Sequence, residues 1–364
     1  MVSIKIFVSD EGFGHIVRQR AIVIELLKKI PDAKIIFQTE KHLEEAKKLL
    51  GERVEYVKQF HNIVTIKNED GSLNVEKTYE IIKDYPNASK RLIEKEFKKF
   101  DYDFVISDFV PEVFYLSKKL DVKNCGVAHF TWDWFFSRLY PYDKNLLNTF
   151  SEYLDGMDEI FFPPLTPDEN LERFSEKKRE IPFIVRDDIK RIKRKRQEEH
   201  DKFKILIIDS GTGALANTIK RNLEILRKMK DMEFYLPPMF NSIDDNIHII
   251  PRIEDVPIFI SQSDLIIARA GFNTATEAIV SRVPMLLIEE KNNPEIEENI
   301  KKIYRLGLCG KLTLEMFINN FKNSLEKFLN EEYDIIRKNI LKFKFKTNGA
   351  EIIAKEIKKR IGSS

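Results

Sequence analysis

The sequence is poor in cysteine and lacks long apolar runs. Cys125 and Cys309 are the two cysteines among 364 residues, one in each half. With this spacing neither a disulfide framework nor a CxxC zinc site can be built. No apolar stretch approaches the roughly 18 to 20 residues that a membrane-spanning helix needs, and residues 1–8 lack a signal-peptide pattern. We therefore expect a protein of the reducing cytoplasm.

An excess of charge of one sign is also missing. The 61 basic and 59 acidic residues give a net charge of +2, so nothing in the total charge favours a nucleic-acid-binding protein. A composition of 43% hydrophobic and 33% charged residues is typical of globular proteins. The length exceeds what one hydrophobic core usually organises, so we expect two domains of roughly 150 to 180 residues each.

Short strand-like runs alternate with helical patterns through both halves. In the first half the strand-like runs cover residues 4–9, 34–38, 54–57, 104–107, 124–128 and 159–162, and the helical patterns cover 16–27 and 75–100. In the second half the strands are expected at 203–208, 233–236, 247–249, 265–268 and 285–288, and helices at 214–229 and 349–361. This alternation predicts a parallel sheet with crossover helices in each half.

The predicted boundaries follow from a change in composition near the middle. Prolines and then a basic run at 186–196 interrupt the pattern. We expect a first domain at 1–165, a linker at 166–202, a second domain at 203–345 and a C-terminal helix at 346–364. Each half opens with a strand, a glycine turn and a helix. The predicted fold is therefore α/β, with two Rossmann-like, doubly wound domains that face each other across a cleft.

The first glycine turn carries a candidate base. Gly12 and Gly14 follow the first strand, at the strand end where open α/β sheets bind ligands. His15 can act as a base near neutral pH, and Arg18, one helical turn later, can hold an anion. A purely structural turn is an equal alternative, because glycine turns after a first strand are common. Glu112, which also follows a strand, is the second candidate base.

Residues 269–277 form the stronger signal, between a strand and a helix. Gly271 lets the backbone approach a ligand, and Asn273 and Thr274 are expected to cap the helix so that its amides face an anion such as a diphosphate. Glu277, one turn into the helix, is placed to accept the hydroxyls of a ribose. The alternative is a capping box formed by Thr274 and Glu277 that only stabilises the helix.

Together these segments resemble MurG-like glycosyltransferases of family 28. The turn at 12–15, the Ser210-Gly211-Thr212-Gly213-Ala214 turn, residues 253–256 and the block at 269–277 followed by Pro284 occur in the family's order. The family includes the two-subunit eukaryotic enzyme that adds the second N-acetylglucosamine to dolichyl diphosphate, and archaeal N-glycan transferases of that type. The resemblance implies a GT-B fold and inverting transfer of a sugar, expected to be N-acetylglucosamine, from a UDP-sugar to a lipid-diphosphate-linked sugar.

The resemblance also implies roles for individual residues. Ile253 would meet the uracil through its backbone, and Glu277 would bind the ribose. Apart from the resemblance, we expect Arg269 either to help the departing diphosphate or to pair structurally. The remaining donor contacts would come from Ser210, Gly211, Thr212, Gly271, Phe272, Asn273, Thr274 and Glu295. Ile296 stands where the family has a sugar-binding glutamine. On the acceptor side we expect the turn with Gly12, Gly14 and Arg18, with His15 as base or acceptor positioner.

No metal or cofactor is expected beyond the UDP-sugar, which is a substrate. Asp101-Tyr102-Asp103 matches a metal-binding Asp-x-Asp pattern, but it precedes a strand and is predicted to be a solvated loop. The remaining histidines show no ligand spacing. The alternative function is a UDP-sugar hydrolase or epimerase, because some sugar-nucleotide hydrolases share the turn at 12–15 with Arg18.

Membrane contact is left as an alternative. The aromatic segment 130–142 is expected to pack in the core, or else to meet a membrane or the lipid acceptor. The basic run at 186–196 would add attraction to anionic lipid. The expected partners are thus the UDP-sugar and the lipid-linked acceptor, with peripheral contact at the cytoplasmic face of the membrane and no nucleic acid.

Overall fold

In the computed structural model the chain forms two compact α/β units. The structure describes residues 1–58, 63–186, 202–208, 215–240, 244–251 and 255–362. The first unit comprises Met1–Ile66, Asn74–Arg186 and Lys346–Ser364, and the second comprises Lys67–Leu73 and Asp187–Phe345. Each unit has its own sheet and its own hydrophobic core.

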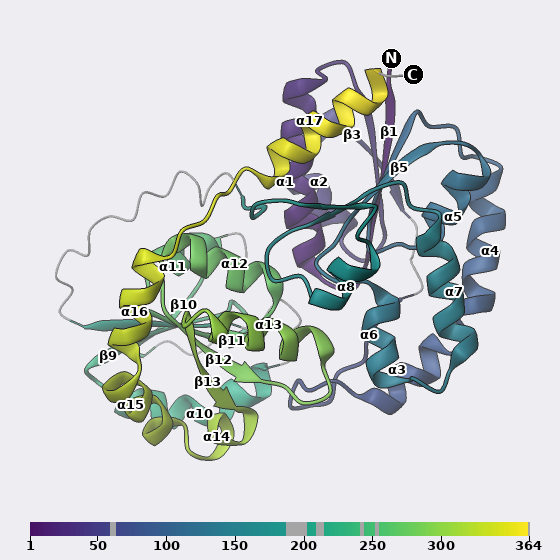
Figure 1. The fold of residues 1–364 in the computed structure, drawn as a ribbon. Coiled ribbons are helices and arrows are strands. Elements are labelled where there is room, and N and C mark those ends of the chain that lie inside the picture. The colour runs from purple at the N-terminus through teal and green to yellow at the C-terminus, as the bar shows by residue number, and fades with distance from the viewer. Residues whose placement is uncertain (59–62, 187–201, 209–214, 241–243, 252–254, 363–364) are drawn as a thin grey trace. The chain divides into compact units, whose positions relative to one another are not determined.

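Within its described residues, the first unit is built on a seven-stranded parallel sheet (Figure 1). In spatial order the strands are β3 (Val54–Lys58), β2 (Lys34–Thr39), β1 (Ser3–Val8), β4 (Phe104–Asp108), β5 (Lys123–Val127), β6 (Ile160–Phe162) and β7 (Lys178–Glu180). Its helices are α1 (Phe13–Lys29), α2 (Leu43–Leu50), α3 (Val75–Ile82), α4 (Tyr85–Phe97), α5 (Glu112–Lys119), α6 (Trp132–Leu139), α7 (Lys144–Asp155), α8 (Asp168–Arg173) and α17 (Gly349–Gly362). All residues of β4 are buried, as expected of a strand covered on both faces.

The second unit has a six-stranded parallel sheet in its described part. The spatial order is β10 (Ile247–Ile249), β9 (Met232–Leu236), β8 (Phe203–Ile208), β11 (Leu265–Arg269), β12 (Met285–Glu289) and β13 (Cys309–Thr313). Its helices are α10 (Ala216–Lys228), α11 (Val256–Gln262), α12 (Phe272–Ser281), α13 (Pro294–Arg305), α14 (Leu314–Asn319), α15 (Phe321–Glu331) and α16 (Tyr333–Lys342). Both sheets run outward in two directions from their first strand, the arrangement of doubly wound folds. The two predicted parallel-sheet domains are confirmed.

Two predicted boundaries were wrong. The helical pattern at 75–100 contains two helices, because α3 ends at Ile82 and α4 begins at Tyr85 with Pro86 in its first turn. Proline is accepted there but would break a continuous helix. The linker predicted at 166–202 begins too early, since α8 and β7 lie within it and belong to the first unit. Residues 187–201 are outside the described residues.

The predicted C-terminal helix, α17, packs on α1 of the first unit (Figure 1). Ile353 and Ile357 of α17 share one core cluster with Ile22 and Leu26 of α1. The last part of the chain therefore completes the core that its first part begins.

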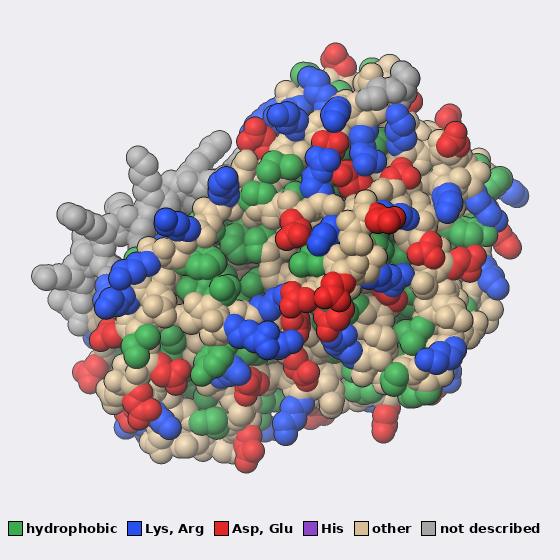
Figure 2. Space-filling view, in the orientation of Figure 1, with side chains coloured by type: hydrophobic (Ala, Val, Ile, Leu, Met, Phe, Trp, Pro, Cys, Tyr) green, Lys and Arg blue, Asp and Glu red, His purple; other side chains and the backbone are tan. Residues whose placement is uncertain are grey.

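Charged side chains are mixed on the surface. On the face shown in Figure 2, acidic and basic groups alternate, without a large area of one sign. This distribution agrees with the balanced net charge of +2.

A buried carboxylate ties α17 to the edge of the first sheet. Glu159, which is 6% exposed, lies directly before β6. Its carboxylate pairs with Arg179 Nε of β7 at 3.0 Å and with Arg360 Nη2 of α17 at 3.1 Å. A buried charge is costly unless it is paired. Arg360 therefore anchors the last helix through an interaction that hydrophobic contact alone does not supply.

We expect Arg360→Ala to lower the free energy of unfolding of the first unit by about 1–3 kcal/mol, because the buried carboxylate of Glu159 loses one of its two cationic partners. Thermal or urea unfolding measures this loss. Lys358, exposed on the same helix, is the matched control, and Lys358→Ala should change stability by less than about 0.5 kcal/mol. Equal effects of the two substitutions would contradict the anchoring role of Arg360.

Candidate functional site

In the first unit, β1 and β4 lie side by side at the point where the strand order reverses. Val8 pairs with Asp108 in the register of these strands, and Ser9 N donates to the Asp108 carbonyl oxygen at 3.0 Å. The chain leaves β1 through the glycine turn and enters α1, whereas β4 ends at Asp108. Ligands of open α/β sheets bind at this place, outside the carboxyl ends of the strands.

Three side chains from the start of α1 form hydrogen bonds with the carboxylate of Asp108. His15 Nδ1 lies 2.7 Å from Oδ1, Arg18 Nε donates to Oδ2 at 2.9 Å, and Gln19 Nε2 donates to Oδ2 at 2.7 Å. Arg18 Nη2 adds a second bond to Oδ1. The spacing of three and four residues places these side chains on one face of the helix. The predicted residues His15 and Arg18 are thus brought together, and Asp108 joins them.

The carboxylate of Asp108 is charged although it is fully buried. Burial alone would raise its pKa, but the charge of the Arg18 guanidinium and the hydrogen bonds from His15 and Arg18 outweigh burial and hold the pKa well below its ordinary value. A carboxylate accepts hydrogen bonds only. His15 Nδ1 therefore carries the proton that it shares with Asp108. Arg18 Nη2, 3.1 Å from Nδ1, is a neighbouring donor and not a partner of that nitrogen.

This tautomer leaves Nε2 of His15 as a proton acceptor. The side chain of His15 is 14% exposed, so the ring is held by the protein but still reaches the surface. A histidine whose Nδ1–H is bound to a carboxylate can take a proton at Nε2, and the carboxylate stabilises the imidazolium that results. The arrangement can therefore serve general base chemistry.

Hydrogen bonds from residues 39–41 hold the turn between β1 and α1. Asp10 Oδ1 accepts hydrogen bonds from Thr39 Oγ1 at 2.7 Å and from the amides of Glu40 and Lys41 at 2.9 and 3.0 Å. Gly12 is the extended N-cap residue of α1, with open space where a Cβ would stand. In the described part of the chain, no side chain caps this helix. The start of α1 can therefore receive an anion.

Glu112, the second candidate base, lies apart from this network. It is 2% exposed at the start of α5, and its Oε2 accepts from Tyr85 Oη at 2.6 Å. Burial raises the pKa of Glu112. Because no described contact joins it to His15 or Asp108, its placement favours a packing role, and its role as base stays a prediction that the geometry does not support.

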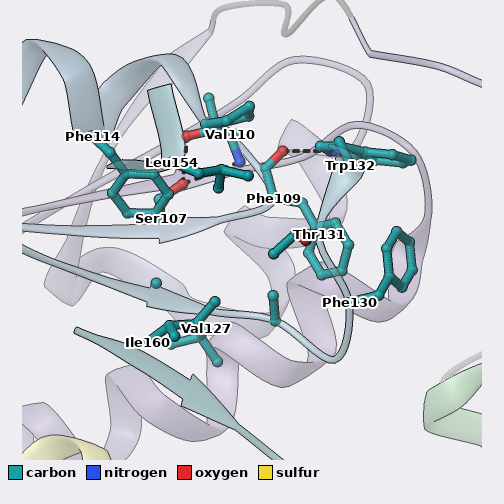
Figure 3. A pocket seen from close by; sticks show the side chains of 13 residues that line it. Ser107, Phe109, Val110, Phe114, Val127, Phe130, Thr131, Trp132, Leu154 and Ile160 are labelled. Carbon is teal, nitrogen blue, oxygen red and sulfur yellow. Dashed lines mark hydrogen bonds between the residues drawn. The ribbon is translucent and has the colours of Figure 1, made fainter. Parts of the chain in front are cut away.

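A small apolar pocket lies beside the ends of β4 and β5, and residues of both strands line it (Figure 3). Its cavity volume is about 20 Å³, room for roughly one water molecule. Phe109, Phe130 and Trp132 line it. A hexose cannot enter such a space, so the pocket is a gap in the aromatic packing and not an acceptor site.

The aromatic segment 130–142 is largely core. Phe130, Trp132, Trp134, Phe135, Phe136 and Tyr140 are each 5% exposed or less, while Tyr142 is 66% exposed. The expected packing in the core therefore holds for nearly all of these rings. Contact of the segment with a membrane or with the lipid acceptor stays a prediction, for which Tyr142 is the exposed ring. No helix within the described residues is long and apolar enough to cross a bilayer. Of the basic run at 186–196, all but Arg186 lies outside the described residues.

The Asp-x-Asp pattern at 101–103 serves the fold. Asp103 Oδ2 accepts hydrogen bonds from Ser3 N at 2.7 Å and Ser3 Oγ at 2.9 Å, which hold the start of β1. Among the residues that the structure describes, no group of three or more His, Cys, Asp or Glu side chains is arranged to hold a metal.

In the second unit, the strand order reverses between β8 and β11. Ile208, the last residue of β8, pairs with Ala268 of β11, so the two strands end at the same edge of the sheet. Residues 209–214, with Ser210, Gly211 and Thr212, follow β8 and lie outside the described residues, as does Ile253. The segment after β11 is described and begins α12.

The start of α12 differs from the predicted cap. Gly271, not Asn273 or Thr274, is the N-cap residue, so the expected caps lie inside the first turn and the capping box of Thr274 with Glu277 is wrong. No side chain among the described residues caps this helix. The amides of Asn273 and Thr274, in the first turn, have no acceptor within the helix. Together with the helix dipole they make an anion site.

Neighbouring side chains hold the turn before α12. Asn299 Nδ2 of α13 donates to the Ala270 carbonyl oxygen at 2.8 Å. Arg269 is buried and paired with Glu290, whose Oε1 also accepts from Asn293 Nδ2 at 3.1 Å. Of the two predicted roles of Arg269, the structure thus shows the structural pair.

The other predicted donor residues line the same end of the sheet. Phe272 and Glu277 are 3% and 6% exposed, whereas Asn273, Thr274 and Glu295 are half-buried. Ile296, which stands where the family has glutamine, is 3% exposed. The polar groups nearest to solvent are therefore those of the first turn of α12 and the start of α13.

Sequence reasoning missed Asp108, Gln19 and His129. Arg18 Nη1 lies 3.4 Å from His129 Nδ1, at the end of β5. Asp108 and His129 lie 90 and 111 positions from Arg18 in the sequence. No local sequence pattern therefore joins them to Arg18. The usable signal was position alone: Asp108 and His129 each follow a predicted strand.

Part of the chain matches a known protein family. Residues 193–357 match the profile of the glycosyltransferase family 28 C-terminal domain. A UDP-N-acetylglucosamine–N-acetylmuramyl-(pentapeptide) pyrophosphoryl-undecaprenol N-acetylglucosamine transferase of Thermosipho melanesiensis is 29% identical over 177 residues, 47% of this chain and 50% of the relative. The enzyme of the same name from Thermosipho africanus is 28% identical over 43% of this chain and 47% of its own length. The chain thus spans about half the length of these curated relatives.

Solved structures show the same fold over the whole chain. The calicheamicin glycosyltransferase CalG4 has a TM-score of 0.65 at 15% identity and covers 99% of this chain and 98% of its own. Phytolacca americana UGT2, solved with UDP-2-fluoroglucose and pterostilbene, has a TM-score of 0.67 at 12% identity, with 100% of both chains covered. These matches confirm the predicted GT-B fold, and the family match confirms the resemblance to family 28.

The charged state of Asp108 predicts how stability responds to acid. A carboxylate whose pKa is lowered on folding stabilises the folded state above its unfolded pKa of about 3.9, and this contribution is lost as the pH falls below that value. Asp108→Asn should therefore be less stable than wild type at pH 7, and the difference should narrow below about pH 4. Urea unfolding at pH 7 and pH 3 measures it, with the exposed Asp121→Asn as control. A difference that does not depend on pH would contradict a charged Asp108.

Proposed function

We propose that this chain, whose residues 193–357 match the profile of the glycosyltransferase family 28 C-terminal domain, is an inverting glycosyltransferase. It moves a sugar from a UDP-sugar to a lipid-diphosphate-linked sugar. The observation that carries the proposal is the contact of His15 Nδ1 with the buried, charged Asp108 at 2.7 Å, which leaves Nε2 as a base in a chain of GT-B fold.

The second unit binds the donor in this proposal. The first-turn amides of α12, which no described side chain caps, receive the diphosphate, and the helix dipole favours its negative charge. The carboxylate of Glu277 accepts hydrogen bonds from the ribose hydroxyls. Residues 210–212 and 253 complete the donor site as predictions from the family resemblance, because they lie outside the described residues.

The first unit supplies the base. Nε2 of His15 takes the proton of the acceptor hydroxyl as that oxygen attacks the anomeric carbon of the donor sugar. The bond from that carbon to the diphosphate oxygen breaks, and UDP leaves with the electron pair. A single displacement of this kind inverts the anomeric configuration. Asp108 stabilises the imidazolium, and the amides of α12 stabilise the departing diphosphate.

The donor sugar and acceptor are proposed from the relatives. The curated matches are named as N-acetylglucosamine transferases that act on a pyrophosphoryl-undecaprenol substrate. N-Acetylglucosamine and a lipid diphosphate are therefore the first substrates to try, in glycan assembly such as N-glycosylation. Peripheral contact with the cytoplasmic face of the membrane belongs to the same proposal, since the acceptor is a lipid.

Donor binding can be tested at Glu277. Loss of the contacts with both ribose hydroxyls should weaken UDP binding about 10- to 100-fold in Glu277→Ala. Calorimetric titration with UDP and 2′-deoxy-UDP gives a sharper result: wild type should discriminate between them, and the variant should not. Glu315, exposed on α14, provides the control Glu315→Ala. If Glu277→Ala retains the full discrimination, the ribose contact is elsewhere.

Catalysis can be tested at His15. We expect His15→Ala to lower kcat about 10²- to 10⁴-fold, the usual contribution of a general base, while UDP affinity is unchanged. Transfer is measured from UDP-N-acetylglucosamine to a short-chain lipid diphosphate sugar, with a reaction lacking acceptor alongside. Release of free sugar at the same rate without acceptor would identify a hydrolase, and conversion of the donor sugar an epimerase; either result would overturn the proposed transfer.

A further inference from the structure

The turn after β4 holds a phenylalanine in a conformation that phenylalanine rarely adopts. Phe109 has a φ of 63°, in the left-handed region where an L-residue loses roughly 1–2 kcal/mol. Glycine or asparagine is the usual choice at such a position. Backbone strain of this kind persists only where surrounding contacts enforce it, and it concentrates at functional sites.

Two side chains enforce this conformation (Figure 3). Trp132 Nε1 donates a hydrogen bond to the Phe109 carbonyl oxygen at 2.9 Å. Ser107 Oγ donates to the Val110 carbonyl oxygen at 2.7 Å and accepts from Val110 N at 3.1 Å. The turn is thus tied on both sides of Phe109. Trp132 is 3% exposed, so its hydrogen bond is shielded from water.

The strained backbone directs the Phe109 ring against the base. The ring centroids of Phe109 and His15 are 5.0 Å apart at an interplanar angle of 69°. The Arg18 guanidinium carbon lies 5.5 Å from the centroid of the Phe109 ring. Phe109 directly follows Asp108, whose carboxylate binds His15 Nδ1. Two neighbouring residues of one turn therefore contact the imidazole. Asp108 binds Nδ1 through a hydrogen bond, and Phe109 packs its ring edge-to-face against the imidazole ring.

The geometry points to Phe109 and Trp132 as positioning residues that set the direction of His15 Nε2. This inference rests on the proposed transferase function. The hydrogen bond to Asp108 fixes one atom of the imidazole but leaves the ring able to turn about that bond. The Phe109 ring closes one side, and Trp132 holds Phe109 in place. Direction matters because a misplacement of about 1 Å can cost about 10²-fold in rate.

A packing role alone would have different consequences. Loss of packing lowers stability but leaves the imidazole of the folded protein where it was. Loss of positioning lowers kcat and leaves the KM for the UDP-sugar unchanged, because neither residue takes part in donor binding. Phe135 belongs to the same aromatic cluster and packs on Phe130, Trp132 and Phe136, without a described ring contact to a histidine. It supplies the matched control.

The variants are Phe109→Leu, Trp132→Phe and, as control, Phe135→Leu. Trp132→Phe keeps an aromatic ring and removes the N–H, so it tests the idea even if Phe109→Leu does not fold. We expect both test variants to lower kcat at least 10-fold, with the KM for the UDP-sugar within 2-fold of wild type. Phe135→Leu should keep the wild-type kcat. Wild-type kcat in both test variants would overturn the inference.

A double substitution tests whether Trp132 acts through Phe109. Glycine adopts the left-handed conformation without support. In a Phe109→Gly background, Trp132→Phe should therefore cause no further loss of kcat, whereas it causes a loss in wild type. If the two losses multiply independently, Trp132 does not act by holding Phe109.

A spectroscopic measurement separates this inference from the proposed function. The Nδ1–H proton of His15, bound to a carboxylate, should give a distinct downfield NMR signal in protein with ¹⁵N-labelled histidine. We expect this signal in wild type and Phe135→Leu, and its broadening or shift in Phe109→Leu and Trp132→Phe. If wild type transfers no sugar, the proposed function fails while this signal still decides on positioning. A signal unchanged in both test variants, or missing from wild type, overturns the inference.

Discussion

The chemistry of the first unit depends on one fully buried carboxylate, Asp108. A charge removed from water must be paired and hydrogen-bonded within the protein. This requirement brings His15, Arg18 and Gln19 of α1 to the end of β4. It also fixes the proton on the imidazole, because a carboxylate offers no proton in return. The arrangement of the base is thus a consequence of satisfying a buried charge.

In the second unit, the backbone at the start of α12 takes the place of charged side chains. Arg269, the cation nearest to the start of α12 in sequence, is paired with Glu290. In the proposed donor site the positive charge comes from the helix terminus, where Gly271 is the N-cap residue and no side chain among the described residues caps the helix. Such dipoles are fixed before a ligand arrives, and they need no rearrangement when negative charge develops. In the proposed transfer, the first unit uses side chains for its chemistry and the second uses peptide groups.

Much of the fold could be predicted from the sequence, because buried parallel strands are continuous apolar runs. The strands at 203–208 and 247–249 were predicted with their observed bounds. The edge strands β7 and β13 were missed, since short or polar runs such as Lys178–Glu180 resemble loops. Within the site, His15 and Gly271 could be predicted from local sequence motifs. The partnership of His15 with Asp108 spans 93 positions, and only the assembled sheet reveals it.

The placement of α17 has a consequence for biosynthesis. The segment that closes the first core is synthesised after the whole second unit, because Ile353 and Ile357 lie beyond Phe345 in the sequence and pack with residues of α1. Until then, the nascent first half exposes an apolar face on α1 and is open to aggregation or chaperone binding. The second half, translated later, needs no such late segment. The core of the first unit is thus complete only once the residues of the second unit have also been synthesised.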